Sequence, residues 1–479
     1  MKLSRLEVLS PEEINLIHQR SLDILAEVGI LVESEAAREL VLSHGGKLKD
    51  KRGVVTVPPK LVERCVKLLP REVPLFDREG NLAFTLGDGG MYCVSGHNAV
   101  FMLDTERGER RDSTVQDVER FAVISQEMSD IDMVGVPLMP QDVTPQTTLL
   151  HAIAAIFRNA TRPVFFSSES EAINRAVIEM GKAVMGKATL QGSSCLVSQL
   201  STTSPLYWER GAVEALLLVA REGVPLDFLP QPIAGLTAPY TLAGLLAVHN
   251  AEVLSGVVLA QLVNPGTPVI YGAAWTTYEM KRANVLIGRA ESSLLRIAGA
   301  QMAHFYGMPS HTTAPDTDAH LPDQQTAWEK MLSTVAGLIG GNDMVVNLGM
   351  FGTGMIVSLE QLVLDNEMYR IVKRFARGIE VDENHIAFEV IRSVGPRGEF
   401  LTSEHTLRFL RTGEHQELWV SSGANYEGWV NEGRKSVYEK AADIVVKILQ
   451  RGPRFPLSEE KARCLQEIII ESERRMGVH

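Results

Sequence analysis

The sequence predicts an α/β protein, an eight-stranded parallel (β/α)8 barrel of the TIM type with an N-terminal α+β extension and a C-terminal helical extension. Between residues 88 and 380, apolar runs alternate with stretches of helical period, as in parallel βα units. Eight such runs, each followed by a helix, is the number that closes a barrel. The 479 residues suffice for this barrel and for extensions at 1–87 and 381–479.

The N-terminal extension mixes helix with short strands. Ser10 and Glu13 have the spacing of a capping box, and an amphipathic helical pattern follows them. Residues 53–57 alternate as a strand does, and Pro58 and Pro59 end it.

The central region contains the strands and helices of the predicted barrel. Strands are predicted at 91–95, 132–138, 163–167, 195–200, 226–231, 268–274, 309–313 and 344–348. Helices are predicted at 114–128, 144–158, 170–184, 207–222, 241–263, 290–306, 323–340 and 358–378. After the first strand, the insertion GHNAVFMLDTERGERR has the pattern of a hairpin that turns at 106–108. The C-terminal extension is mostly helical and ends in a charged helix at 458–476.

Composition excludes several classes of protein. The net charge of −12, without a basic run, disfavours binding to nucleic acid. The four cysteines form no CxxC pair, which is typical of reduced thiols. The N-terminus contains acids and lacks the apolar core of a signal peptide, and the apolar stretch 253–263 is too short to span a bilayer. These features predict a cytoplasmic protein.

The active site of such a barrel is expected at the carboxyl ends of the strands. No GxSxG, HExxH, GxxxxGK[ST] or strand-following GxGxxG motif is present. The predicted mouth is instead rich in aromatic and amide side chains, which suits a small organic cation. Trp275 is the strongest candidate for contact with that cation. The residues expected at the mouth include Tyr92, His97, Asn98, Glu169, Gln231, Tyr271, Trp275, His311, Asp316, Asn347 and Phe351.

One polar loop has the composition of a metal site. It carries His311, Asp316, Asp318 and His320, but no helical His pair or CxxC supports them. We therefore expect no metal, and we expect the acids, or Asp323, to cap the next helix.

Several long segments resemble the trimethylamine methyltransferase superfamily. They are PIAGLTAPYTLAGLLAVHNAEVLSGVVLAQLVNPGTPVIYG (232–272), DTERGERRDSTVQDVERFA (104–122), residues 358–411 and NYEGWVNEGRKSVYEKA (425–441). The resemblance extends nearly from end to end.

This resemblance implies a barrel that demethylates a methylated amine and loads the methyl group onto Co(I) of a separate corrinoid protein. The founding members carry pyrrolysine near the loop that here spans 312–325, where this chain has only standard residues. The chain therefore looks like the pyrrolysine-free branch, which acts on quaternary amines such as glycine betaine, proline betaine or carnitine. The resemblance also implies no tightly bound cofactor, since cobalamin comes with the partner, and it implies a homo-oligomer.

The expected chemistry assigns roles to the mouth residues. A quaternary amine leaves as a neutral tertiary amine and needs no acid. Glu169 and Asp316 are candidates to face the ammonium, and Asp316 lies in the loop where the family keeps its special residue; the alternative for each is that it caps the following helix. His311 is a candidate to hydrogen-bond the corrinoid face or a water. Aromatic contacts of about 0.5–2 kcal/mol each are expected from Tyr92, Trp275 and Phe351, with Tyr271 nearby. A remote carboxylate is expected at His97, Asn98, Gln231, His311 or Asn347.

Two other functions fit the same pattern. One is a barrel methyltransferase that uses a methoxy compound or methyltetrahydrofolate as donor. The other is a betaine-binding barrel without turnover.

Overall fold

A closed barrel of eight parallel strands forms the centre of the protein in the computed structural model, which describes residues 3–104, 107–417 and 419–477. The strands follow one another around the barrel in chain order, and β18 closes it on β6. All eight predicted strands are in it, so the predicted fold class is confirmed. The strands are β6 (Tyr92–Ser95), β9 (Met133–Gly135), β10 (Val164–Ser167), β11 (Leu196–Leu200), β13 (Leu226–Phe228), β14 (Val269–Ala273), β17 (Ser310–Thr313) and β18 (Met344–Leu348).

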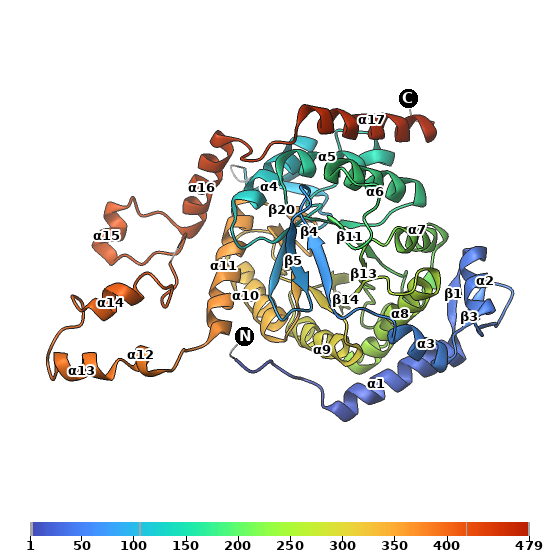
Figure 1. The fold of residues 1–479 in the computed structure, drawn as a ribbon, viewed down its shortest axis with the longest axis horizontal. Coiled ribbons are helices and arrows are strands. Elements are labelled where there is room, and N and C mark those ends of the chain that lie inside the picture. The colour runs from blue at the N-terminus through green and yellow to red at the C-terminus, as the bar shows by residue number, and fades with distance from the viewer. Residues whose placement is uncertain (1–2, 105–106, 418, 478–479) are drawn as a thin grey trace.

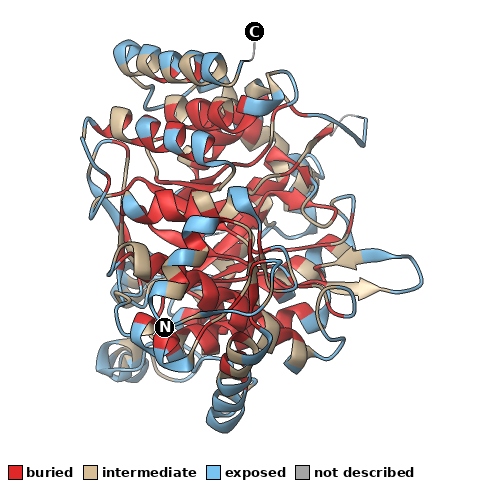
Figure 2. Ribbon diagram, turned by 90° about the vertical axis from the view of Figure 1, so that its right-hand side faces the viewer, coloured by how far each residue is buried: buried red, intermediate tan, exposed pale blue. Residues whose placement is uncertain are grey.

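A shell of helices surrounds the barrel, one after each strand, and buried residues are concentrated between the two layers (Figure 2). Thr114 begins α4 with a capping box, and Asp323 caps α10 as expected. The helices lie where the sequence predicts them. They are α4 (Val115–Glu127), α5 (Thr148–Asn159), which follows a 3-10 turn at Pro145–Thr147, α6 (Glu171–Met185), α7 (Arg210–Arg221), α8 (Leu242–Val263), α9 (Ala290–Tyr306), α10 (Gln324–Ile339) and α11 (Leu359–Arg377).

Helix α8 is long and apolar enough to cross a membrane by length and composition alone. However, 72% of its apolar window is buried inside the protein. A helix that is apolar on all sides is typical of a fully packed position, and α8 packs against α1, α3, α7 and α9. Helix α8 is therefore a core helix of the barrel protein.

The amino-terminal end of the barrel is closed by a hairpin of β4 (Val73–Phe76) and β5 (Leu82–Leu86), which lies across the barrel in Figure 1. Side chains of this hairpin and of the barrel interior form one buried cluster. The cluster consists of Val73, Leu75, Phe84, Leu86, Val94, Met133, Phe165, Val197, Ile270, Met344 and Val346. In the described residues, packed side chains therefore fill the barrel at its amino-terminal end.

The rest of the N-terminal region packs on the outside of the shell. Helix α1 (Pro11–Asp23) has the predicted capping box of Ser10 and Glu13, and a π-helical turn at Ile24–Val28 follows it. Strand β1 pairs with β12 (Tyr207–Trp208) in the loop after β11, which ties the extension to the barrel. The remaining elements are β1 (Ile30–Val32), α2 (Glu35–Ser43), β2 (Lys47–Leu48), β3 (Val54–Thr56) and α3 (Pro59–Val66).

Loops at the carboxyl ends of the strands form small sheets. The predicted hairpin is present as β7 (Phe101–Asp104) and β8 (Glu109–Asp112), although position 106 of its turn lies outside the described residues. Strand β7 also pairs with β20 (Ile356–Val357), which pairs with β19 (Met350–Phe351). After β14, a second hairpin joins β15 (Thr277–Glu279) to β16 (Asn284–Leu286).

The C-terminal region first leaves the barrel and then returns to it. An arm of four short helices stands away from the shell in Figure 1, and none of these helices buries a residue. They are α12 (Glu383–Ile386), α13 (Phe388–Val394), α14 (Glu404–Phe409) and α15 (Tyr426–Asn431). Helix α16 (Val437–Arg451) then packs on α11, and α17 (Glu459–Arg475), the predicted charged helix, packs on α6.

We predict that the hairpin is essential for stability. Leu75→Ala removes a side chain that is 0% exposed and leaves a cavity among the interior residues. It should lower the free energy of unfolding by about 2–5 kcal/mol. Leu82→Ala, on the same hairpin but 59% exposed, is the matched control and should change it by less than about 0.5 kcal/mol. Urea denaturation of both variants checks this, and equal stability of the two would contradict the packing of the hairpin into the barrel.

Candidate active site at the barrel mouth

A buried pair of Asp227 on β13 and His311 on β17 lies inside the barrel. Strand alternation turns both side chains inward, and both are 0% exposed. His311 Nδ1 lies 2.9 Å from Asp227 Oδ2. Because an ionised carboxylate only accepts hydrogen bonds, Nδ1 carries the proton. His311 Nε2 and Asp227 Oδ1 have no hydrogen-bond partner among the described residues. A buried pair with two unused polar atoms is a candidate ligand site.

Gly272 on β14 makes room for this pair. A Cβ at this position would lie 2.9 Å from Asp227 Oδ1 and 2.6 Å from the carbonyl oxygen of Phe228. Because Gly272 has no side chain, only the backbone of β14 lies beside the Asp227 carboxylate at this position.

A chain of polar side chains continues from the pair towards the opening. Gln199 is the cross-strand neighbour of Asp227. Asn98 Nδ2 donates to Ser167 Oγ at 2.6 Å, and Ser167 Oγ donates to Gln199 Oε1. Gln199 Nε2 in turn donates to Ser201 Oγ at 2.6 Å. These bonds fix the side chains at the ends of three strands, β6, β10 and β11, and they leave Asn98 Oδ1 without a partner in the described chain.

His97 completes this cluster and is neutral. Its ring lies 5.1 Å from that of Phe165, whose edge contacts the His311 ring at 5.4 Å. Burial, and secondly the positive charge of a protonated His311, lower the pKa of His97 to about 3. His97 therefore carries no charge at neutral pH and does not repel a cation.

Asp316 is already paired. Its Oδ2 lies 2.5 Å from Arg296 Nη2, and both side chains are buried. Its Oδ1 accepts from Asn347 Nδ2 at 2.8 Å, which holds Asn347 in a backbone conformation with φ of +102°. The Asp316 carboxylate, predicted to face an ammonium, is thus neutralised by the Arg296 guanidinium. Its second oxygen holds the Asn347 side chain in place. Asn347 Oδ1 is buried and has no partner among the described residues.

Glu169 follows β10 and is half-buried. Burial raises the pKa of its carboxyl group. Its backbone N–H donates to Asn174 Oδ1, whereas the side chain that caps α6 is Ser170. The capping explanation offered for Glu169 is therefore wrong, and its carboxylate remains a candidate for the ammonium.

The structure places Tyr92 away from the mouth. Tyr92 is the first residue of β6, so it lies at the closed end of the barrel. Its ring stacks on Phe84 of the hairpin at 4.4 Å, and its hydroxyl donates to Asp88 at 2.7 Å. The expectation of a substrate contact from Tyr92 assigned the side chain to the wrong end of the strand.

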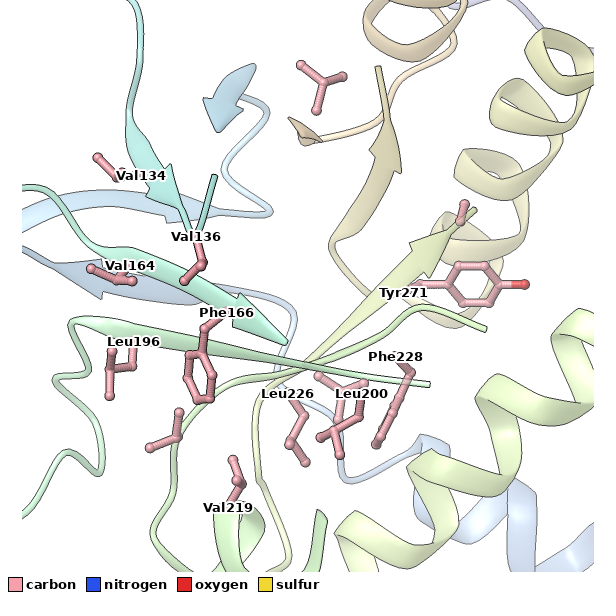
Figure 3. Packing of buried hydrophobic residues seen from close by; sticks show 14 of the residues in the cluster. Val134, Val136, Val164, Phe166, Leu196, Leu200, Val219, Leu226, Phe228 and Tyr271 are labelled. Atoms are coloured by element: carbon pink, nitrogen blue, oxygen red, sulfur yellow. The ribbon is translucent and has the colours of Figure 1, made fainter. Parts of the chain in front are cut away.

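Tyr271 and Trp275 both pack outside the barrel interior: Tyr271 has outward parity on β14, and Trp275 follows the end of that strand. Tyr271 points toward the surrounding helices in Figure 3, and its hydroxyl donates to Asn250 on α8. The Trp275 ring lies 4.5 Å from that of His249 on α8 and packs against Gly299 on α9. Both rings were expected in the pocket, and both pack instead between the barrel and its shell.

Phe351 and Gln231 also lie apart from the cluster. Phe351 is buried in a separate apolar group with Leu103 and Ile356, all three from the strands of the small sheet formed by the loops. Gln231 is exposed. Of the predicted residues, the structure brings together His97, Asn98 and His311.

The loop residues considered as metal ligands do not converge. His311 pairs with Asp227, and Asp318 accepts from the backbone N–H groups of Ile287 and Gly288. His320 is exposed. Across the described ranges, no group of three or more His, Cys, Asp or Glu side chains is arranged to hold a metal ion.

Sequence reasoning missed Asp227, Ser167, Gln199 and Arg296. For Asp227 a signal exists, since a charged residue at an inward position of the apolar run LDFL is unusual without a partner. Arg296 lies within a helical pattern, and nothing in that pattern marks it as buried.

We predict that Asp316 acts mainly on stability. Asp316→Asn leaves the buried Arg296 guanidinium without its counter-charge and should lower the free energy of unfolding by about 3–5 kcal/mol. Glu279→Gln removes one partner of the more exposed pair with Arg289 and, as the control, should change stability little. Urea denaturation and specific activity are compared. Unchanged stability with abolished turnover would instead give Asp316 a chemical role.

Comparison with known proteins identifies the family. The model of the family described as trimethylamine methyltransferase (MTTB) matches residues 1–477. The chain is 31% identical over 470 residues to trimethylamine methyltransferase MttB of Desulfitobacterium hafniense (strain DSM 10664 / DCB-2), covering 98% of this chain and 94% of that protein. It is 32% identical over 407 residues to glycine betaine methyltransferase of Desulfitobacterium hafniense (strain Y51), covering 84% of each.

A solved structure, the Methanosarcina barkeri monomethylamine methyltransferase, aligns with a TM-score of 0.49 and 12% identity over 91% of this chain and 92% of that one. Since the family model spans almost the whole sequence, the chain belongs to the trimethylamine methyltransferase (MTTB) family.

Proposed function

We propose that the protein transfers a methyl group from a quaternary amine of the betaine type to Co(I) of a separate corrinoid protein and releases the tertiary amine. Family membership supports methyl transfer. The observation that carries the choice of substrate is the polar cluster inside the barrel, where Asp227 pairs with His311 and His97 is a neutral imidazole. The Arg296 guanidinium is neutralised by Asp316. A betaine carries one positive and one negative charge, so it meets no unbalanced charge in this cluster.

The reaction is an in-line displacement. Co(I) attacks the methyl carbon, the C–N bond breaks, and its electron pair stays on nitrogen. A quaternary ammonium leaves as a neutral tertiary amine, so no proton is transferred in this step. His97, with a pKa of about 3, is not protonated at neutral pH and is no acid for a leaving group. A substrate that is already charged suits this site, whereas a methoxy or folate donor needs protonation.

The placement of the aromatic rings is consistent with this chemistry. The positive charge on nitrogen fades toward the transition state, so a tight aromatic cage would stabilise the substrate more than the transition state. Tyr92, Tyr271 and Trp275 lie outside the cluster, and the ring beside His97 and His311 is that of Phe165. Substrate positioning therefore depends on polar contacts more than on a cage.

The proposal extends to the partner and the location. The corrinoid protein brings the cobalamin and docks over the carboxyl ends of the barrel strands, where the β7–β8 and β15–β16 hairpins lie. The enzyme works in the cytoplasm as a homo-oligomer. Its catalytic barrel spans residues 88–380, between extensions at 1–87 and 381–479.

An anaerobic substrate screen tests the function. The protein is mixed with Co(I) cobalamin and glycine betaine, proline betaine, carnitine or γ-butyrobetaine, and methylcobalamin is followed by absorbance. We expect methylcobalamin and one tertiary amine per turnover from at least one of these compounds.

Two results would overturn the proposal. Methylcobalamin formed from a methoxy compound or methyltetrahydrofolate alone would assign another donor. Binding of a betaine in calorimetry, without methylation of Co(I) cobalamin or of a corrinoid protein, would indicate a binding barrel without turnover.

A further inference from the structure

The His311–Asp227 pair has one nitrogen available for a ligand. Asp227 occupies His311 Nδ1 at 2.9 Å, and Nε2 has no partner in the described part of the chain. The Phe165 ring packs edge to face against the His311 ring, at 5.4 Å between centroids, and restricts its plane. The imidazole is therefore held in one orientation, with one direction left for a hydrogen bond.

The reaction sets the direction in which the substrate enters. Cobalt is held in a flat macrocycle on another protein, which reaches the opening but not the packed interior of an eight-stranded barrel. The reacting methyl group must therefore face outward, and the non-reacting end of the substrate points inward. In a betaine that end is a carboxylate, and the inward end of the polar cluster is the His311–Asp227 pair.

We propose that His311 is the anchor for the substrate carboxylate, with its imidazolium Nε2–H donating to a carboxylate oxygen, and that Asp227 is the positioning residue that holds the imidazolium. This inference rests on the proposed function. Asp227 and protonated His311 together carry no net charge. The imidazolium donates to the substrate carboxylate, while Asp227 balances its positive charge from the other side of the ring. Glu169 or the open mouth then faces the ammonium.

The groups around His311 determine where the proton resides. The titratable side chains that the structure places against it are Asp227 and His97. Its strand neighbours are Gly272 on β14 and Met344 on β18, and neither carries a charge. Of the two imidazoles, His311 is the one with a carboxylate partner, whereas burial, and secondly the charge of a protonated His311, lowers the pKa of His97 to about 3. His97 and Asn98 are therefore left as neutral contacts.

Proton uptake on binding tests this assignment without any turnover. Glycine betaine is titrated into the whole protein by calorimetry, in two buffers of different ionisation enthalpy, at intervals from pH 6 to 9. Because the complex requires the imidazolium, the uptake should rise with pH toward about one proton per bound betaine, while affinity falls. Tetramethylammonium lacks a carboxylate and should bind without uptake. A buffer-independent enthalpy for glycine betaine at every pH would overturn the proposal.

Variants separate the anchor from its support. His311→Gln should abolish the uptake and weaken glycine betaine binding roughly 10- to 100-fold. Asp227→Asn should weaken it to a similar extent and move the uptake to lower pH. Neither should change the affinity for tetramethylammonium. Asp142→Asn, an equal change of charge at an exposed residue, is the control and should leave both ligands unaffected. Equal losses for both ligands in the variants would contradict the anchor.

The outcomes distinguish this inference from the proposed function. Proton-linked betaine binding without methylcobalamin would sustain the anchor and reject the methyl transfer. Demethylation of glycine betaine by His311→Gln with the same KM as the wild-type protein would sustain the methyl transfer and reject the anchor. If either variant fails to fold by circular dichroism, the buffer dependence of the wild-type protein decides alone.

Discussion

Closure of the eight strands is the constraint on which the rest of the structure depends. A closed parallel barrel forces alternate residues inward, where space is limited, and the others outward against the helices. In β13 this places Asp227 inside and Phe228 outside, and in β14 it places Gly272 inside and Tyr271 outside. Whether a side chain belongs to the site or packs against the shell therefore depends on whether it occupies an inward or an outward position on its strand.

Three buried pairs of an acidic and a basic side chain lie in the barrel and its helical shell. Arg296 holds Asp316, His311 holds Asp227, and Lys330 holds Asp365 at 2.8 Å with neither side chain exposed. Asp365 also accepts from the N–H of Gly349, so it fixes the chain just after β18. Isolated buried charges would be costly, and paired ones restrict the loops to one arrangement. The Asp227–His311 pair differs from the other two because a polar atom of each partner is left unused.

The elements of the barrel were predictable because hydrophobic period is a local property. Eight strands, their helices, the capping box at Ser10 and the cap at Asp323 follow from residues close together in the chain. The site was less predictable, because its pairs join residues that are far apart. His311 and Asp227 are 84 positions apart, and no local pattern links them.

Errors at the site have a common physical cause. Aromatic side chains near strand ends were assigned to the mouth because of their residue type. Their location depends instead on the end of the strand at which they lie and on whether they point inward or outward. Tyr92 starts its strand and so lies at the closed end, Tyr271 has outward parity, and Trp275 packs against α8 and α9 after its strand has ended. Counting alternate positions from Asp227 would have found the inward set on that strand.

The hairpin of β4 and β5 blocks the amino-terminal end of the barrel, so a substrate must enter and leave at the carboxyl end. In the proposed reaction the amine has to bind before the corrinoid protein covers the carboxyl end. The demethylated product then stays in the site until the corrinoid protein dissociates. Turnover then follows a compulsory sequence, in which the last molecule to arrive is the first to depart.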